Sequence, residues 1–547
     1  ARPALAELQH CLVPSHARQH AMRSFASGAT APSSDASSES TLGLLHLIEG
    51  RGGKKSDVEE GPAEGRVLSS AGGLSRVQVE GPVAVGQLVS LGGSSQGVVL
   101  QFNRRGVVVA ELTQERPRAG ATATLGGTFS VQAPVDCTGV KFTSVAELLH
   151  AEDGTGTGGL LRLPRMPLPQ RRRPSLHRLP SGLAAAEVLL PLGEGQRVGL
   201  VGPHRTGKST AAKMLLSSQS QDTVCVYATM QPRAKLEPQL NSLEGVGRGL
   251  IVVHADAMDP AGVRYLQPLC ALHLAAQLRK AHRHVVLVLD DLVAFSEAAA
   301  ELSSSAGRGS ALPLSASHIV SAALDSAGCV EEGGRESALS VITVLDLEPD
   351  DELPPAQRDL WRGAEPSLDV NLRFDGQLAA NGVLPAINLE ELWPCGFAPT
   401  FQAPLLRLLR RELVITLQQG SALKKRLDVI GELGLHVEMD EQEAVASAAA
   451  ARSLFSHSAP RSLPELAVLL CAAVVYTFPA RRHPSPTAVA VFQRRVLAAI
   501  QTAHPVLWQS LSSMEALSEE EAAGALQNLG RALLQHRYDF EFTRPEL

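Results

Sequence analysis

The chain has 547 residues, of which 44% are hydrophobic and only 4% aromatic, and its net charge is −6. This length predicts about three domains, because single domains usually contain about 100–200 residues. The small net charge argues against a role on nucleic acid or at a membrane surface. Seven scattered cysteines without paired metal-ligand spacing argue against a disulfide framework or a zinc site and fit a reducing compartment. The longest apolar run, 466–478, is too short for a bilayer and predicts a buried helix.

The N-terminal segment, 1–56, differs from the rest in composition. Residues 1–34 hold arginines and histidines but a single acidic residue, Glu7, as in an organelle transit segment. An ordinary flexible tail explains this composition nearly as well. The sequence does not begin with methionine, which is compatible with a leader of which part is missing. Residues 30–41 read as flexible, and 42–48 as one short helix.

Short β-rich runs separated by glycine occupy 57–136. Their spacing predicts a small antiparallel β-barrel or sandwich. Examples of these runs are 65–68, 75–79, 87–91, 97–102 and 106–109. A Gly/Pro/Arg-rich connection, 154–180, follows and includes three consecutive arginines, Arg171–Arg173. We interpret these arginines as part of a solvated linker rather than as a binding patch.

The segment 137–392 is predicted to be an α/β domain. Strands and helices alternate from Val188 to about 392, which indicates a parallel sheet covered on both faces. The expected strands are 197–201, 223–228, 249–254, 285–289 and 340–345. Beyond it, 393–547 has leucine and alanine at helical spacing and predicts a bundle of helices.

Residues 202–209, Gly-Pro-His-Arg-Thr-Gly-Lys-Ser, match every position of the phosphate-binding loop pattern. A hydrophobic strand enters this loop and a helix-prone segment leaves it, so backbone N–H groups would face the phosphates at a helix N-terminus. Lys208 would reach the β- and γ-phosphates, and Ser209 would bind magnesium. Pro203 lacks an N–H, which would weaken binding. The expected nucleotide contacts are Gly202, Arg205, Thr206, Gly207, Lys208, Ser209 and Thr210.

A second part of the site is expected where the strand 285–289 ends in Asp290 and Asp291. Asp290 is the candidate for the magnesium shell, and the alternative is an acidic turn that only caps the strand.

After the second strand the chain carries Gln231. A neutral amide can hold a water molecule but cannot remove its proton, and hydrolysis would call for a glutamate at this position. Glu237 and Glu244 are other carboxylates that the sequence does not place.

The order of these parts resembles the alpha subunit of F-type ATP synthases. The likeness runs through a β-barrel, an arginine-containing linker and an α/β core with a phosphate loop to a helical C-terminal domain. The segments that carry it are 171–173, 191–209, 256–266, 290–292, 382–388 and 492–534. The resemblance implies ATP or ADP with Mg²⁺ as ligands, and a hetero-oligomeric ring with beta-type subunits around a central shaft. It also implies a location on the matrix side of the mitochondrial inner membrane, with neither a membrane span nor bound nucleic acid.

The chain departs from that family where alpha subunits lend an arginine to the neighbouring beta subunit. Counted from Gly382, this position is Cys395, and the nearest arginines, Arg373 and Arg407, lie elsewhere in the pattern. Loss of such an arginine costs about 10³–10⁵ in rate. The stretch 307–328, where the family has a well-marked loop, is barely recognisable.

The resemblance also places two residues on the base side of the nucleotide. Leu384 replaces an arginine before the matched Pro385, which stays a candidate contact. The segment 418–421 falls where the family approaches the adenine, so Gln418 is the other candidate.

Three functions are compatible with these features. The leading hypothesis is a non-catalytic, alpha-like structural or regulatory subunit of the mitochondrial ATP synthase. The second is a working alpha subunit of a divergent lineage with a relocated arginine. The third, an independent hexameric ATPase of the helicase type, is disfavoured by the weak basic balance and the few aromatic residues in the barrel segment.

Overall fold

The computed structural model describes residues 64–151 and 177–536, apart from gaps at 104–105, 135, 242, 244–245, 307–314, 333, 348–353, 390–392, 395–401, 433–438, 456–460 and 476–485. The described residues belong to one compact unit, Ala63–Leu547. The predicted transit-like segment, the helix at 42–48, Arg171–Arg173 and Cys395 lie outside the described residues.

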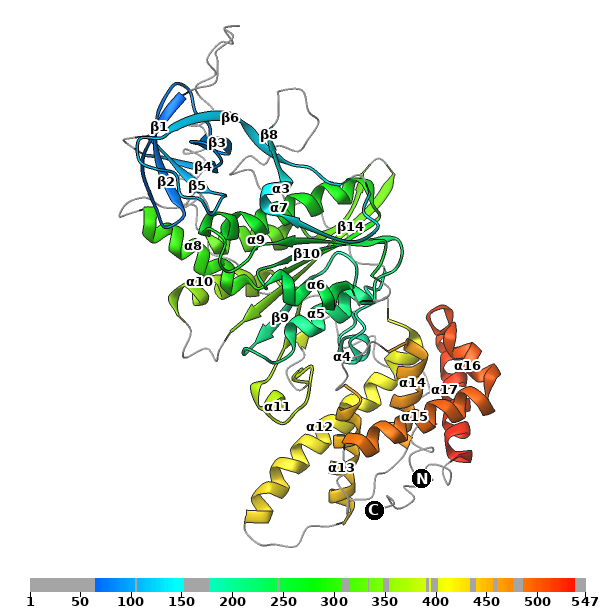
Figure 1. Ribbon diagram of the computed structural model, residues 1–547. Coiled ribbons are helices and arrows are strands. Elements are labelled where there is room, and N and C mark those ends of the chain that lie inside the picture. Colours follow the sequence, from blue (N-terminus) through cyan, green and yellow to red (C-terminus); the bar gives the residue numbers. More distant parts are fainter. Residues whose placement is uncertain are drawn as a thin grey trace, which may run out of the picture. The chain divides into compact units, whose positions relative to one another are not determined.

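The first described part is a closed antiparallel barrel (Figure 1). The strand order is β1-β2-β5-β4-β3-β6, and β1 also pairs with β6, which distinguishes a barrel from the alternative of an open sandwich. Alternating apolar side chains such as Val67, Val77 and Val109 fill its interior. The strands are β1 (Glu64–Ala71), β2 (Leu74–Glu80), β3 (Gln87–Leu91), β4 (Gln96–Asn103), β5 (Gly106–Glu111) and β6 (Thr122–Val131).

The second part is the α/β core, which confirms the expected fold class. Its sheet has the order β16-β15-β9-β14-β12-β10-β11-β7, and the five strands predicted from the sequence are β9, β10, β11, β12 and β14. Two short strands, β13 and β16, pair antiparallel, so the sheet is mixed at these places. The strands are β7 (Gly139–Ser144), β9 (Arg197–Gly202), β10 (Thr223–Thr229), β11 (Gly249–His254), β12 (His284–Asp290), β13 (Gly328–Glu332), β14 (Arg335–Asp346), β15 (Val370–Arg373) and β16 (Trp393–Pro394).

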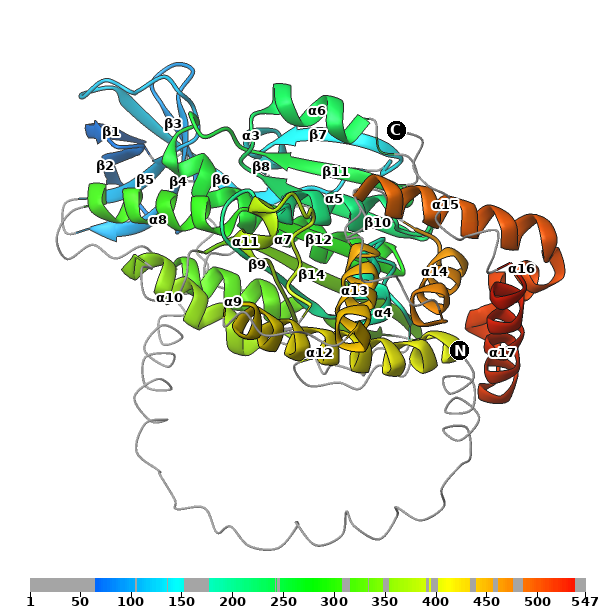
Figure 2. The same ribbon diagram turned by 90° about the horizontal axis from the view of Figure 1, so that it is seen from below.

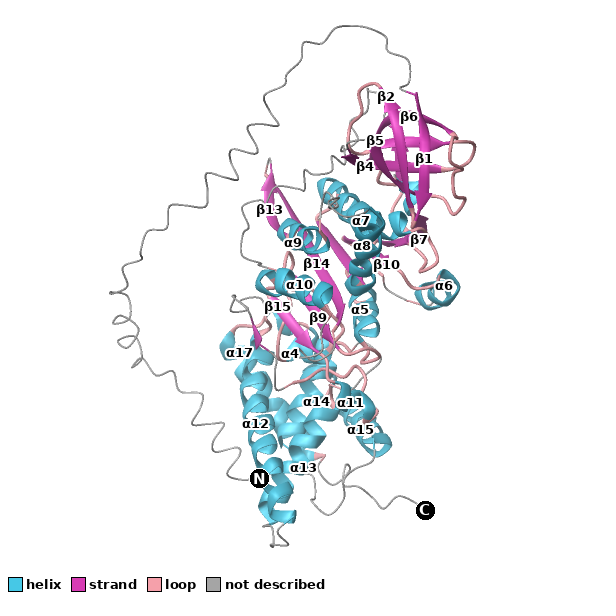
Figure 3. Cartoon of the chain, turned by 90° about the vertical axis from the view of Figure 1, so that its left-hand side faces the viewer, coloured by secondary structure: helices cyan, strands magenta, loops and turns pink. Residues whose placement is uncertain are grey.

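Helices cover both faces of this sheet, as the buried strand sequences predict (Figure 3). Cys225 and Tyr227 of β10 pack into the same core as α4 (Ala184–Val188), α5 (Lys208–Ser217) and α6 (Arg233–Asn241). The intervening Val224 and Val226 pack with α7 (Ala261–Ala281), α8 (Leu292–Ala306), α9 (Ala316–Ser326) and α10 (Pro355–Ala364). The remaining short elements are α3 (Val145–Leu148), β8 (Leu149–Ala151), η2 (Glu365–Ser367) and α11 (Gly376–Ala380).

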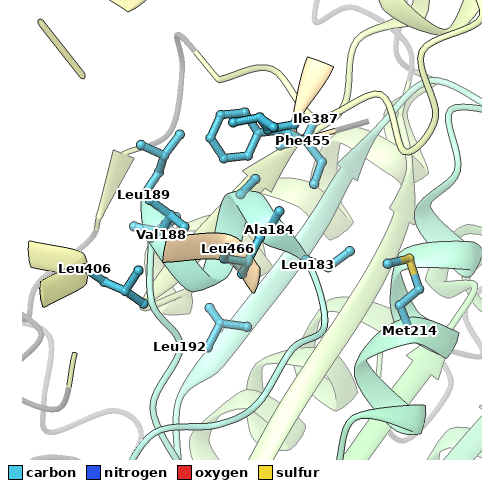
Figure 4. Close-up of a cluster of buried hydrophobic side chains, with 14 of the residues drawn as sticks. Leu183, Ala184, Val188, Leu189, Leu192, Met214, Ile387, Leu406, Phe455 and Leu466 are labelled. Carbon is cyan, nitrogen blue, oxygen red and sulfur yellow. The ribbon is translucent and has the colours of Figure 1, made fainter. Parts of the chain in front are cut away.

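The third part is helical, as predicted (Figure 2). The apolar run from 466 falls mostly on α14, whose residues 466–473 are buried, and no described helix is both long and apolar enough to cross a membrane. Leu406 and Leu466 from this part lie in one apolar cluster with Val188 of α4 and with Leu183, the residue before that helix (Figure 4). The elements are α12 (Pro404–Glu432), α13 (Met439–Ser453), α14 (Leu463–Val475), α15 (Pro486–Ala503), α16 (Pro505–Ser512), η3 (Met514–Ala516) and α17 (Glu519–Gln535).

Candidate nucleotide-binding site

The predicted site residues follow the carboxyl ends of adjacent parallel strands. Gly202 at the end of β9 pairs with Asp346 at the end of β14, and Thr229 of β10 pairs with Asp290 of β12. Since β14 lies between β9 and β12, the loop 203–207 and the two aspartates meet at one edge of the sheet. Ligands of open α/β sheets bind at this edge.

Two glycines allow the loop its shape. Gly207 has φ 90°, and a Cβ there would lie 3.2 Å from Cα of Pro385. Gly202 has φ 154°, and a Cβ there would lie 2.3 Å from the backbone oxygen of Phe374. Helix α5 then begins at Lys208 with no side chain capping its first turn. The N–H groups of this turn have no partner within the helix, and together with the helix dipole they would favour an anion at the loop.

Lys208 is only 3% exposed, and its ammonium group contacts the backbone of the loop. Its Nζ donates to the backbone oxygen of Gly202 at 2.7 Å and lies 2.6 Å from Oδ1 of Asp346. His204 contacts the other oxygen of Asp346 through Nδ1 at 2.7 Å. Asp346 therefore balances the buried positive charge, and a phosphate bound in the loop would compete with this carboxylate for the ammonium.

Asp290 is the centre of the second cluster. It accepts hydrogen bonds from the Ser209 hydroxyl at 3.2 Å, from the Tyr227 hydroxyl at 2.5 Å and from Nε2 of Gln231 at 3.3 Å. Burial raises its pKa, and the bonds from Tyr227 and Ser209 oppose that shift. The neighbouring Asp291 follows a cis peptide bond, and burial, with the nearby Asp346 charge, raises its pKa to about 7.

The donor set at Ser209 and Asp290 fits Mg²⁺. This ion prefers oxygen ligands and commonly uses one or two protein groups, with phosphate oxygens and water completing six-fold coordination. Within the described ranges, no group of three or more His, Cys, Asp or Glu side chains forms a metal site without such help. Ser209 and Asp290 would therefore hold the ion, and the ion would neutralise phosphate charge there.

The position expected for a water-activating group is occupied by an amide. Gln231 donates to Asp290, and its backbone oxygen is 2.7 Å from Nε2 of His254, so both ends of the residue are fixed. Glu237 does not replace it, because it lies on the exposed helix α6 and pairs with Arg233 at 3.3 Å. Glu244 lies outside the described residues.

The base-side candidates have different surroundings. Pro385 lies against Gly207 after a cis peptide bond, and the next residue, Ala386, donates its N–H to the backbone oxygen of Thr206 at 3.0 Å. Gln418 is an exposed residue of α12, and none of the contacts that join the loop to Pro385, Gln231 and Asp290 includes it. Arg205 and Thr210 are exposed at the loop and on the first turn of α5, respectively.

Sequence reasoning missed Asp346 and Tyr227 as members of the site. Asp346 was detectable in principle, because it ends the predicted strand 340–345 as Asp290 ends the strand 285–289. The two arginines nearest to Cys395 in the sequence both lie close to carboxylates of this chain. Arg373 lies near Trp361 and 3.5 Å from Glu365, and Arg407 lies 3.6 Å from Glu519.

Comparison with known proteins agrees with this geometry. Residues 182–391 match the ATP synthase alpha/beta family, nucleotide-binding domain. The ATP synthase subunit alpha of Sulfurovum sp. (strain NBC37-1) is 27% identical over 338 residues, which make up 59% of this chain and 66% of that relative. The chain thus spans just under two thirds of the length of the curated relative that it matches.

Proposed function

Because the chain is a divergent, alpha-like member of the ATP synthase alpha/beta family, we propose that it is a nucleotide-binding, non-catalytic subunit of an F-type ATP synthase. Its ligand would be ATP or ADP with Mg²⁺. The phosphate would lie on the first turn of α5 and Lys208, and the ion on Ser209 and Asp290. Its role would be structural or regulatory.

The observation that carries this proposal is the amide of Gln231 beside Asp290. Hydrolysis requires a group that positions and deprotonates water, in addition to groups that stabilise the phosphate charge. Lys208 donates to the backbone of the loop and Ser209 donates to Asp290, which supports nucleotide binding, whereas the Gln231 side chain beside them is a neutral donor. The arrangement therefore supports binding and not turnover.

The partners and the location are further parts of the proposal. A relative named as an ATP synthase alpha subunit supports beta-type and central-shaft partners for this chain. The arginine-rich, acid-poor composition of 1–34 supports import into mitochondria and a position on the matrix side of the inner membrane. Purification of the native assembly from mitochondria would test both parts. Finding the chain in three copies per ring, with no conventional alpha subunit, would establish a working alpha subunit instead.

Nucleotide binding by the purified full-length chain tests the central claim. We expect Mg-ATP to bind with negligible turnover, and Lys208→Gln to weaken binding about 10–100-fold, because a charge-assisted hydrogen bond contributes about 1.5–3 kcal/mol. Lys235→Gln on the exposed surface of α6 is the matched control and should leave affinity unchanged. ATPase activity that disappears in Lys208→Gln would refute the non-catalytic assignment.

A further inference from the structure

The C-terminal helices bring together two histidines that are 32 residues apart in the chain. His504 precedes α16 as its N-cap, and His536 follows α17 as its C-cap. Their Nε2 atoms lie 3.3 Å apart, and the two rings meet edge to face with centroids 5.4 Å apart. Both side chains are half-buried. The helices that carry them, α16 and α17, are neighbours in the views of Figures 1 and 2.

The separation of these two nitrogen atoms matches a shared metal ion. In tetrahedral zinc sites the Zn–N distance is about 2.0–2.1 Å, which places two ligand nitrogens about 3.3–3.4 Å apart. We propose that His504 and His536 bind a transition-metal ion of the Zn²⁺ class through their Nε2 atoms. Neutral imidazole suits zinc, copper and nickel, whereas Mg²⁺ and Ca²⁺ prefer oxygen ligands. This site is therefore distinct in chemistry from the magnesium position at Ser209 and Asp290.

An open pocket of about 640 Å³, lined by His504 but not by His536, leaves room on one side for the rest of the coordination shell. Its polar lining includes Ser510, Asn528 and Gln535, whose oxygens and bound water would complete the four ligands. Arg531 also lines the cavity, and its positive charge lowers the affinity for a cation. The part of the chain that the structure describes supplies no third His, Cys, Asp or Glu ligand.

The expected affinity for the metal ion follows from the number of protein ligands, which is two instead of four. Sites with four protein ligands bind zinc tightly, so a pair of imidazole ligands corresponds to weaker binding, with a dissociation constant on the order of 1–100 µM. Cysteine spacing predicts no zinc site in this chain, and the histidine pair is invisible to that rule because tertiary packing alone joins its members. A bound ion would tie the α15–α16 junction to the end of α17.

Metal titration of the full-length chain tests the proposal. Protein treated with a chelator and desalted would be titrated with Zn²⁺ alone by calorimetry. We expect one ion per chain in this affinity range, and at least a tenfold loss of affinity in His504→Gln and in His536→Gln. His318→Gln, an exposed histidine of α9, is the matched control and should bind as the wild type does.

X-ray absorption at the zinc edge of the wild-type protein gives a second measurement that needs no variant. Two imidazole ligands with oxygen in the remaining positions would support the site. Sulfur ligands, or binding that is unchanged in both histidine variants, would overturn it. The contact between His504 and His536 would then be only a hydrogen bond between the two Nε2 atoms.

Discussion

At the scale of single residues, Asp290 connects most of the groups that distinguish this site. It accepts hydrogen bonds from Ser209, Tyr227 and Gln231 while being only 4% exposed. A buried carboxylate with three donors is held in one orientation, which is what a metal shell requires. Burial raises its pKa, and a bound cation would oppose that shift by favouring the ionised form. The metal dependence of nucleotide binding should therefore pass through this residue.

Replacing the carboxylate tests that dependence. In the wild-type chain we expect Mg²⁺ to tighten ATP binding about tenfold or more, because the ion bridges phosphate oxygens and protein. In Asp290→Asn the affinity with Mg²⁺ and with EDTA should differ less than about twofold, because a neutral amide is a poor ligand for Mg²⁺. Glu237→Gln on the exposed helix α6 makes the same chemical change away from the site and should keep the wild-type response. Equal Mg²⁺ responses in wild type and Asp290→Asn would contradict the assignment.

At the scale of an element, β12 begins with a residue that stabilises the sheet and ends with a residue of the candidate site. It starts at His284, which is 1% exposed and lies 3.2 Å from the Thr223 hydroxyl and 2.9 Å from the Ser340 hydroxyl. Burial, together with the neighbouring Arg283, lowers the pKa of this imidazole to about 3. The strand β12 therefore contacts β10 and β14 through a neutral histidine at its first residue, and it carries Asp290 at its last residue.

This histidine predicts a loss of stability in acid. Between pH 6.5 and about 3 the unfolded chain protonates His284 and the folded chain does not, so the free energy of unfolding falls as the pH falls. The contribution of this group is about 1.4 kcal/mol per pH unit. Urea unfolding at pH 7.5, 6.0 and 5.0 should show a shallower decline in His284→Gln than in the wild type.

The comparison with the variant is needed because another group acts in the opposite direction. Burial raises the pKa of Glu194, whose carboxylate lies 3.8 Å from His284, and this group binds protons more readily in the folded state. The same decline in both proteins would show that His284 is not the group responsible.

At the scale of the whole described unit, the barrel and the α/β core share one apolar core. Leu74 and Val108 of the barrel are buried in the same cluster as Tyr265 and Leu266 of α7. The contact is close because Gly262 of α7 has no side chain. A Cβ at this position would lie 2.7 Å from the backbone oxygen of Glu111 and 2.9 Å from Cβ of Ala110. The barrel is therefore expected to unfold together with the core.

Gly262→Ala tests this coupling. The added methyl would collide with backbone and with a Cβ that cannot rotate away, so the free energy of unfolding should fall by about 1–3 kcal/mol. Gly524→Ala in α17 is the control, because nothing lies within 4 Å of its Cβ position. That change should stabilise the helix by about 0.5–1 kcal/mol. Shifts of the same sign in both variants would argue against a tight contact between barrel and α7.

The sequence by itself determined the features that depend on short segments of chain. Residues 202–209 specify the phosphate loop, and the runs that become β9 to β12 are apolar enough to be recognised alone. Gln231 and Asp290 were located by counting from strand ends. The strand β6 was not among the runs named from the sequence, and Gly126 and Gly127 lie in its middle. The predicted domain boundaries and the mitochondrial location stay predictions.

Only the tertiary structure decided which distant residues meet. It closed the barrel by pairing β1 with β6, placed Asp346 on Lys208 and brought His504 to His536. These contacts depend on strand order and helix packing, which local propensity and periodicity do not encode. A side chain's neighbours along the chain reveal its chemistry, whereas its neighbours in space are set by the burial of apolar surface over the whole fold.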